Sequence, residues 1–287
     1  MANETSTNKL ARRLVPTEGG NPPEGALGHG LSQLPQTDDC WAAGFKFGKN
    51  GPHSSRTMML AELGVLLDRM PAGAVNADFR RAVVQENLLN KKTEATRRES
   101  FRRLRELYGL DLGIKVFDVL RAYWAQDRDG RPLLALLVAL VRDPLLRISA
   151  SVILTTPAGA EVRVEQFSDA LLRALPGHLG QRTRLTTARN TASTWEQSGH
   201  LLGHLRKTRA LVRPTPWAVT LALFLAYLSG ERGEYLLSSD WLRVLDVQAG
   251  EASGQVGAAH RLGLLNFFRS GAVVQITFPE LLKPAGD

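Results

Sequence analysis

The sequence predicts a mainly α-helical, two-lobed protein with helix-turn-helix or winged-helix elements and a few short strands toward its C-terminus. Apolar residues recur at helical spacing through most of the chain from residue 56 onward. Ser, Thr, Asn, Gly and Pro stand where these helical segments should begin and end. The clearest strand-like patterns are the stretch 206–216 and the run AVVQITFP at 272–279.

The composition favours a protein with an anionic partner. The chain of 287 residues carries a net charge of +8, and its pI is close to 10. These values favour nucleic acid first, an acidic protein second and a membrane surface third. Cys40 is the only cysteine, which excludes a disulfide framework and a cysteine-based zinc site. The N-terminus lacks the apolar run of a signal peptide, and the apolar runs 133–141 and 217–228 are shorter than a bilayer requires. We therefore expect a cytoplasmic protein with no membrane association.

The first 143 residues predict a tail followed by a helical domain. Residues 1–36 are rich in Gly, Pro, Asn and Thr and lack periodicity, so we expect a disordered tail. The domain spans 37–143 and opens with an Asn-Gly turn. We expect Ser54 and Ser55 to cap a helix that stops before Pro71, and Asn76 to cap the next one. Further helices are predicted over 93–108, 112–123 and 133–141.

The helix predicted over 93–108 is strongly basic. Phe101, Leu104 and Tyr108 fall on one face, and we expect them to be buried. Arg98 and Arg102 lie on the opposite face. Between residues 80 and 108 there are nine Lys or Arg and four Glu, and the Glu residues can pair with Arg at i,i+4 spacing. The pattern is typical of a solvated amphipathic helix or of a polyanion-binding one.

The remaining chain repeats one pattern twice, in domains predicted at 144–216 and 217–287. Each copy has an apolar helix, a short helix that begins near a Ser-Asp pair, a longer helix and a strand-like piece. This order is that of a winged helix-turn-helix. The second copy has little positive charge, so we expect it to be a packing or partner-binding extension.

The first copy carries the second basic segment of the chain. Seven Lys or Arg and one Glu lie between residues 182 and 213, and short polar residues crowd the start of the longer helix. Such residues can bind phosphate oxygens or base edges. The two basic segments together hold more positive charge than the whole chain, which is typical of a nucleic-acid footprint. The predicted nucleic-acid contacts are Lys91, Lys92, Arg97, Arg98, Arg102, Arg105, Arg184, Arg189, Asn190, Thr194, Lys207 and Arg209.

The sequence shows no set of residues typical of an enzyme. It has no P-loop, no dinucleotide glycine fingerprint and no GxSxG motif. His200 and His204 have the spacing of zinc ligands, but the glutamate of the HExxH motif is absent, so we interpret them as a helix-surface pair. We predict no catalytic residues, no metal and no cofactor.

The segment 40–108 resembles the N-terminal half of the BrxA family, whose members belong to bacteriophage-exclusion (BREX) defence systems. The residues that carry the resemblance are GFKFGKNG, SSRTMMLAELGVLL and above all ENLLNKKTEATRRESFRRLREL. Members of the family are typically shorter, and the region after 217 looks like an extension. The resemblance implies an all-helical, non-enzymatic DNA-binding protein that works beside the other BREX components.

We therefore expect a double-stranded DNA-binding accessory protein of phage defence with weak sequence preference. Two alternatives remain open at this point. One is an assembly adaptor whose basic faces dock on acidic partner proteins of the defence complex. The other is an RNA-binding helical protein.

Overall fold

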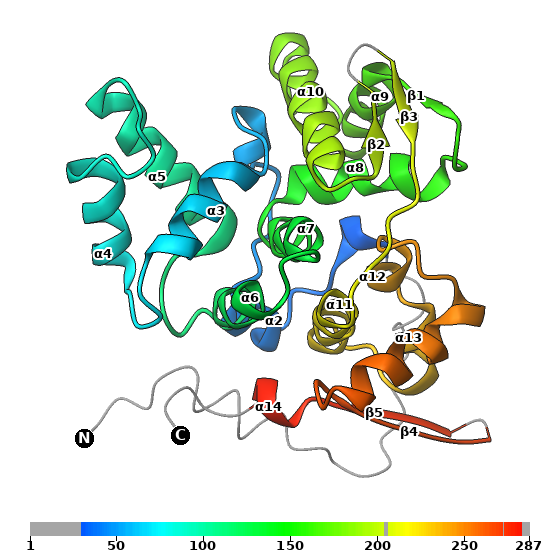
Figure 1. The fold of residues 1–287 in the computed structure, drawn as a ribbon. Coiled ribbons are helices and arrows are strands. Elements are labelled where there is room, and N and C mark those ends of the chain that lie inside the picture. Colours follow the sequence, from blue (N-terminus) through cyan, green and yellow to red (C-terminus); the bar gives the residue numbers. More distant parts are fainter. Residues whose placement is uncertain (1–29, 204–205, 272, 283–287) are drawn as a thin grey trace.

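Helices make up most of the fold, and short antiparallel strands complete it (Figure 1). The structure is a computed structural model and describes residues 30–203, 206–271 and 273–282. The predicted mainly helical class with a few short strands is confirmed. Most of the predicted tail, 1–29, lies outside the described residues. Its last part is not disordered as expected, because Leu31 and Leu34 are buried in the core.

The region before residue 144 is entirely helical among its described elements. It consists of η1 (Leu31–Gln33), α2 (Asp38–Ala43), η2 (Pro52–Ser54), α3 (Leu60–Arg69), α4 (Asn76–Arg80), the π-helical η3 (Arg81–Gln85), α5 (Glu94–Tyr108), α6 (Lys115–Gln126) and α7 (Arg131–Arg142).

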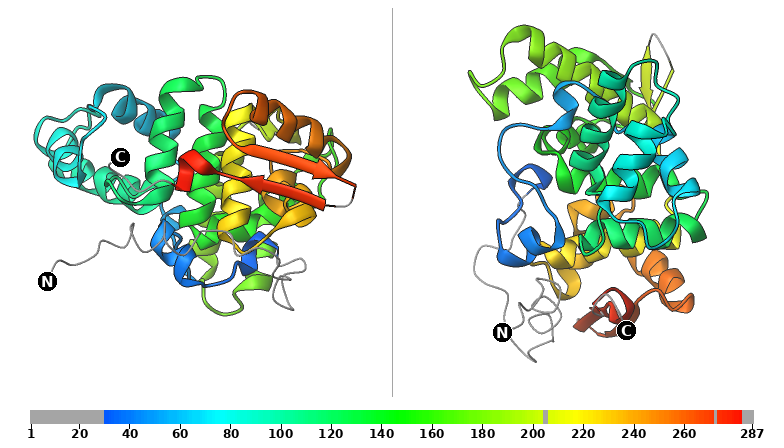
Figure 2. Two further views of the ribbon diagram at one scale, coloured as in Figure 1. Left: turned by 90° about the horizontal axis from the view of Figure 1, so that it is seen from below. Right: turned by 90° about the vertical axis from the view of Figure 1, so that its left-hand side faces the viewer.

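The following region contains both small sheets. Its elements are α8 (Pro144–Thr155), β1 (Glu161–Val162), α9 (Val164–Ala174), α10 (Gln181–Gln197), β2 (Leu201–Leu202), β3 (Lys207–Arg209), α11 (Pro216–Leu228), η4 (Gly233–Ser238), α12 (Asp240–Arg243), α13 (Ala249–Arg261), β4 (Asn266–Ser270), β5 (Val273–Thr277) and α14 (Pro279–Leu282). The first sheet has the strand order β1-β3-β2, and β4 pairs with β5. The α9–α10 pair and the β4–β5 hairpin lie at opposite ends of the molecule (Figures 1 and 2).

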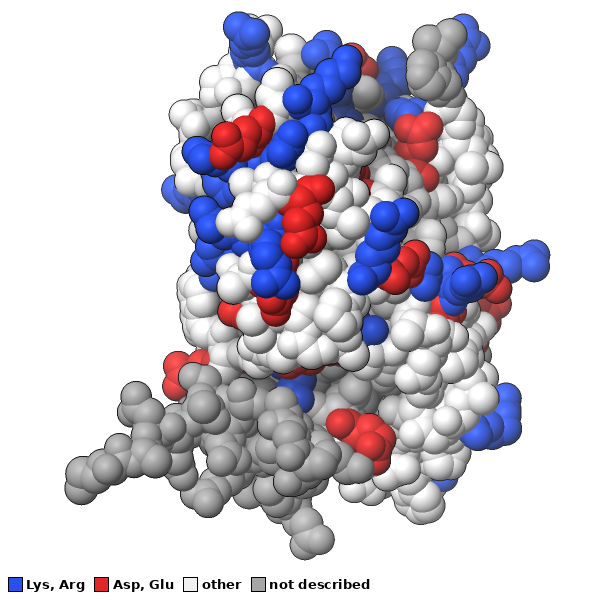
Figure 3. All heavy atoms as spheres, turned by 60° about the vertical axis from the view of Figure 1, so that its left-hand side comes forward, with Lys and Arg blue, Asp and Glu red and all other residues white. Residues whose placement is uncertain are grey.

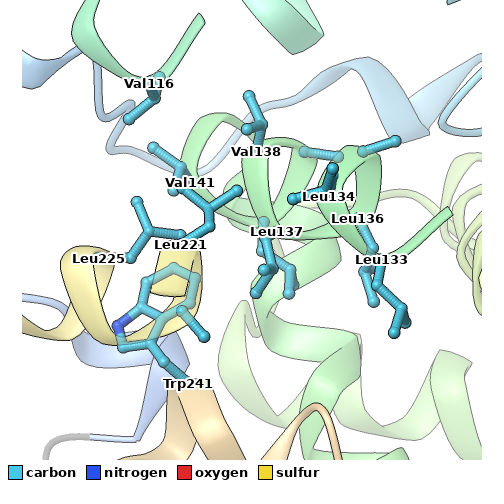
Figure 4. Packing of buried hydrophobic residues seen from close by; sticks show 14 of the residues in the cluster. Val116, Leu133, Leu134, Leu136, Leu137, Val138, Val141, Leu221, Leu225 and Trp241 are labelled. Carbon is cyan, nitrogen blue, oxygen red and sulfur yellow. The ribbon is translucent and has the colours of Figure 1, made fainter. Parts of the chain in front are cut away.

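Two apolar helices from distant parts of the chain form the centre of the core. All residues of α7 from Leu133 to Arg142 are buried, and so are all residues of α11 from Ala218 to Leu228. Leu221 and Leu225 of α11 gather beside Val141 of α7 (Figure 4). Neither helix shows a polar face because each is covered on all sides. The C-terminal region therefore supplies a central helix and is not peripheral to the core.

A buried polar network joins the 52–60 segment to α7, α8 and α10. His53 Nδ1 lies 2.7 Å from Asp143 Oδ2, and His53 Nε2 lies 2.7 Å from Thr194 Oγ1. Asp143 also accepts hydrogen bonds from the backbone N–H groups of Leu145 and Leu146, which caps α8. Gly51 is required beside this network, because a Cβ there would lie 1.9 Å from Asp143 Oδ1.

Several predicted boundaries differ from the observed ones. Ser54 and Ser55 do not cap α3; they lie in and just after η2, and α3 begins after Met59, whose φ of 53° is in the left-handed region. The helix predicted from Asn76 to residue 90 ends at Gln85. The longer helix of the second copy is predicted from about 258 to 268, after a glycine-rich loop. It instead begins at Ala249 and ends at Arg261 as α13, and 266–268 belong to strand β4.

His200 is not on a helix surface. It follows α10, is fully buried, and its Nε2 lies 2.7 Å from the carbonyl oxygen of Val244. The predicted partner, His204, lies outside the described residues. The helix ends earlier than expected because Gly199 adopts a φ of 86° and turns the chain toward β2.

Candidate nucleic-acid interface

The basic helix α5 forms where the sequence predicted it. Thr93 Oγ1 accepts a hydrogen bond from the N–H of Thr96 at the N-terminus, and Gly109 ends the helix. Phe101, Leu104 and Tyr108 are buried, which confirms the predicted apolar face. The Tyr108 hydroxyl donates a hydrogen bond to the carbonyl oxygen of Met58. The buried face therefore fixes the orientation of the arginines opposite to it.

Glutamates of α5 form ion pairs with several arginines on the exposed face of the helix. Arg98 Nη2 lies 2.5 Å from Glu94, and Arg102 contacts both Glu99 and Glu106. Arg103 binds the same two glutamates and is more buried than Arg102. These exposed pairs contribute little to stability, but they lower the positive field of the helix. Arg105 is exposed and has no acidic partner among the described residues.

The residues predicted just before and at the start of α5 have three different environments. Lys91 Nζ is 2.9 Å from Glu62 of α3. Lys92 is exposed to solvent. Arg97 is half-buried, and its guanidinium lies 3.4 Å from the carbonyl oxygen of Val84. Of these three, only Lys92 presents a charge with no partner in the described part of the chain.

The residues predicted from the second basic segment are divided between surface and core. Arg189 is exposed, and Arg184 donates a hydrogen bond to Ser168. Asn190 donates to the carbonyl oxygen of His53 at 2.9 Å, so its amide faces the 52–60 segment. Lys207 forms an ion pair with Glu196.

Two of the predicted contacts are wrong. Thr194 has no exposed surface, because its hydroxyl group binds His53 and the N–H of Met58. Arg209 is 4% exposed and forms a buried ion pair with Asp246. Both look like surface residues in the sequence because they are polar. Their partners lie 37 or more residues away along the chain.

A third basic segment, at 40–61, precedes the other two in the chain and lies between α5 and α10 in space. No Asp or Glu occurs from Cys40 to Ala61, whereas Lys46, Lys49 and Arg56 do; we call this stretch the acid-free segment. It contacts α5 through Met58 and Tyr108, and it contacts α10 through His53 and Asn190. A count of acidic residues along the chain would have identified it from the sequence.

The three basic segments contribute to a surface of mixed but mainly positive charge. Lys and Arg side chains gather in the upper half of the face shown in Figure 3, with acidic side chains between them. Within these three segments, the exposed cations for which the described residues provide no acidic partner are Lys46, Lys49, Arg80, Lys92, Arg105, Arg182, Arg189, Arg206 and Arg213. Such a surface can bind phosphate groups along a backbone.

The fold and this surface define the class as a mainly helical protein with a surface of mixed but mainly positive charge. No protein-family model matches the chain, and no curated protein matches it. Among the helices that the structure describes, none combines the length and the apolar character needed to cross a bilayer. Within the described ranges, no three or more His, Cys, Asp or Glu side chains are grouped so as to hold a metal ion.

Proposed function

We propose that this protein binds double-stranded DNA, mainly through phosphate contacts and with little sequence preference. The observation that carries the proposal is the acid-free segment, which contacts both α5 and α10 and so connects two basic regions far apart in the sequence. Connected cations can follow a phosphate backbone, whereas isolated ones cannot. Two polar side chains of α10 that were predicted to contact DNA, Thr194 and Asn190, face the protein itself, which favours phosphate contacts over base readout.

The proposal includes a winged helix-turn-helix over residues 144–213. The element order α8, β1, α9, α10, β2, β3 and the strand order β1-β3-β2 support it. In this arrangement α10 is the recognition helix, and the strands β2 and β3 belong to the wing. Arg182 and Arg189 are the exposed cations of α10. Arg189 therefore stays in the contact set, and Arg182 joins it when Thr194 and Arg209 are removed.

We further propose that the DNA binding serves phage defence as an accessory, non-enzymatic step. The resemblance of 40–108 to the BrxA family supports this role and suggests other BREX components as partners. The helix α5, which resembles the family's central block, buries its apolar face and exposes Arg98, Arg102 and Arg105. This arrangement is compatible with the role that the resemblance suggests.

The proposal is tested by measuring the affinity for a random DNA duplex across a salt series. We compare the wild type with three charge-reversal variants, Lys92/Arg105→Glu, Lys49/Arg56→Glu and Arg182/Arg189→Glu. Each phosphate contact contributes about 0.9 to the slope of log K against log salt. We expect a steep slope in the wild type and a slope reduced by about 2 in each variant.

The control variant is Arg128→Glu/Arg261→Glu, which makes the same change in net charge. Arg128 is exposed in the turn before α7, at the end of that helix opposite to Arg142, and Arg261 is exposed at the end of α13. We expect the control to keep the wild-type slope. Failure of the folded wild type to bind duplex at low salt would refute DNA binding. Preference for structured RNA in competition, or binding only to an acidic partner protein, would then favour one of the two alternatives.

A further inference from the structure

Arg142 joins the acid-free segment to the C-terminal turn of α5. Its side chain is buried, with 6% of the residue exposed. Nη1 donates to the carbonyl oxygen of Gly44 at 2.6 Å, Nε to that of Glu106 at 2.9 Å, and Nη2 to that of Arg105 at 3.4 Å. One guanidinium therefore holds the backbone two residues before Lys46 next to the backbone of Arg105.

A second buried arginine holds Lys46 itself. Arg147 Nη2 donates to the carbonyl oxygen of Lys46 at 2.7 Å, and Nη1 donates to that of Val141 at 2.9 Å. The N–H of Lys46 donates to the same carbonyl of Val141 at 3.1 Å. Both backbone groups of Lys46 are thus fixed, while its side chain and that of Arg105 are exposed to solvent.

No nearby carboxylate neutralises these cations. Glu106 and Glu99 bind Arg102 and Arg103, and Asp143 binds His53. Burial, together with the charges of Arg142 and Arg105, lowers the pKa of Lys46. Burial and the charge of Arg105 lower the pKa of Arg142 to about 10. The C-terminal carbonyl groups of α5 face Arg142, so the negative end of the helix dipole stabilises the charge of Arg142. The charges of Lys46 and Arg105 are left without such compensation.

We infer that Lys46 and Arg105 form a phosphate-binding pair that the buried Arg142 and Arg147 organise in advance. The inference rests on the proposed function and narrows it to one position on the basic surface. Like charges held together without a counter-ion attract an anion strongly, and a phosphate diester can accept hydrogen bonds from both side chains at once. Because both backbones are already fixed, phosphate binding orders little beyond the two side chains.

The first test is the slope of log K against log salt for duplex DNA with Lys46→Ala, Arg105→Ala and the double variant. If both cations bind one phosphate, the slope should fall by about 0.9 in the double variant. Each single variant should already show most of this decrease, because removal of either cation weakens the same contact. The matched control Arg128→Ala/Arg261→Ala removes the same charge and is expected to keep the wild-type slope. Thermal melting checks the fold, which truncation of two exposed side chains should leave intact.

An unchanged slope in the double variant would overturn the inference and leave DNA binding standing. Additive losses of one contact per residue would also overturn it, because the two cations would then bind separate phosphates. If the wild type does not bind DNA, titration calorimetry with inorganic tripolyphosphate tests whether Lys46 and Arg105 bind phosphate at all. Binding by the wild type and not by the double variant would uphold the pair although the proposed function had failed. No binding by the wild type would overturn both.

Discussion

Single buried polar residues connect distant parts of this chain. His200 Nδ1 accepts a hydrogen bond from the Ser198 hydroxyl group at 2.8 Å, and Nε2 donates to the carbonyl oxygen of Val244. A carbonyl oxygen can only accept, so Nε2 carries the proton of the neutral ring. The buried pair of Arg209 and Asp246 reinforces the same junction between β3 and the C-terminal region. Burial, opposed by the bond to Val244, lowers the pKa of His200 to about 4.

This lowered pKa makes stability depend on pH. The unfolded chain binds a proton at His200 near pH 6.5, whereas the folded protein does so only near 4. The contribution is therefore complete above pH 6.5 and is lost as the pH falls from 6.5 to 4. We expect about 2 kcal/mol of the loss between pH 7.5 and 5.0 to come from this residue. Urea denaturation at both pH values should show a smaller difference for His200→Gln; an equal difference would contradict the assignment.

At the scale of the element, α5 separates a stabilising face from a charged face. Its buried face packs on the core through Leu104 and Tyr108, and its outer face carries arginines that pair with glutamates of the same helix. On the proposed function, stability and polyanion binding therefore reside in different side chains of one helix. Because of these ion pairs, the electrostatic field at the surface of α5 is weaker than the number of its Lys and Arg residues suggests.

Truncating a buried side chain of α5 should lower stability without changing DNA binding. Leu104→Ala removes a fully buried side chain and is expected to lower the free energy of unfolding by about 2–5 kcal/mol, because it leaves a cavity. The slope of DNA affinity against salt should stay at the wild-type value in conditions where the variant is folded. Arg98→Ala is the complementary control, with little change in urea stability expected. A flattened salt slope in Leu104→Ala would show that the inner face also controls binding.

For the whole molecule, one hydrophobic core extends from Leu31 to Leu281. The helix α11 lies in it beside α7, although their first residues are 85 positions apart along the chain and the two helices belong to different predicted domains. The exposed cations of the three basic segments lie outside this core. The C-terminal region therefore supports the basic surface without adding net positive charge, since residues 217–287 carry a net charge of −2.

Removal of the C-terminal region should prevent folding. A chain that ends at Arg213 lacks α11, so the buried side chains of α7 that face it would be exposed to water. We expect such a chain to aggregate or to lack cooperative thermal unfolding, as measured by size-exclusion chromatography and circular dichroism. The full chain is the reference. A soluble truncated chain with a sharp transition would show that residues 30–213 fold independently.

Local features of the sequence predicted local features of the structure. The caps Thr93 and Gly109 and the apolar spacing of Phe101, Leu104 and Tyr108 were sufficient to place α5. Caps and periodicity act between residues a few positions apart, so a single sequence contains them. The same information failed at Ser54 and Ser55, because the chain before α3 follows contacts with α10 rather than its own capping residues.

The sequence by itself determined the helical class, the basic helix and the excess of positive charge. Only the tertiary structure decided which polar residues face inward, as it did for Thr194, Arg209 and His200. It also brought Lys46 beside Arg105 through Arg142. The reason is physical: burial and ion pairing depend on groups that are distant along the chain and adjacent only after folding, whereas charge and periodicity are properties of the chain itself.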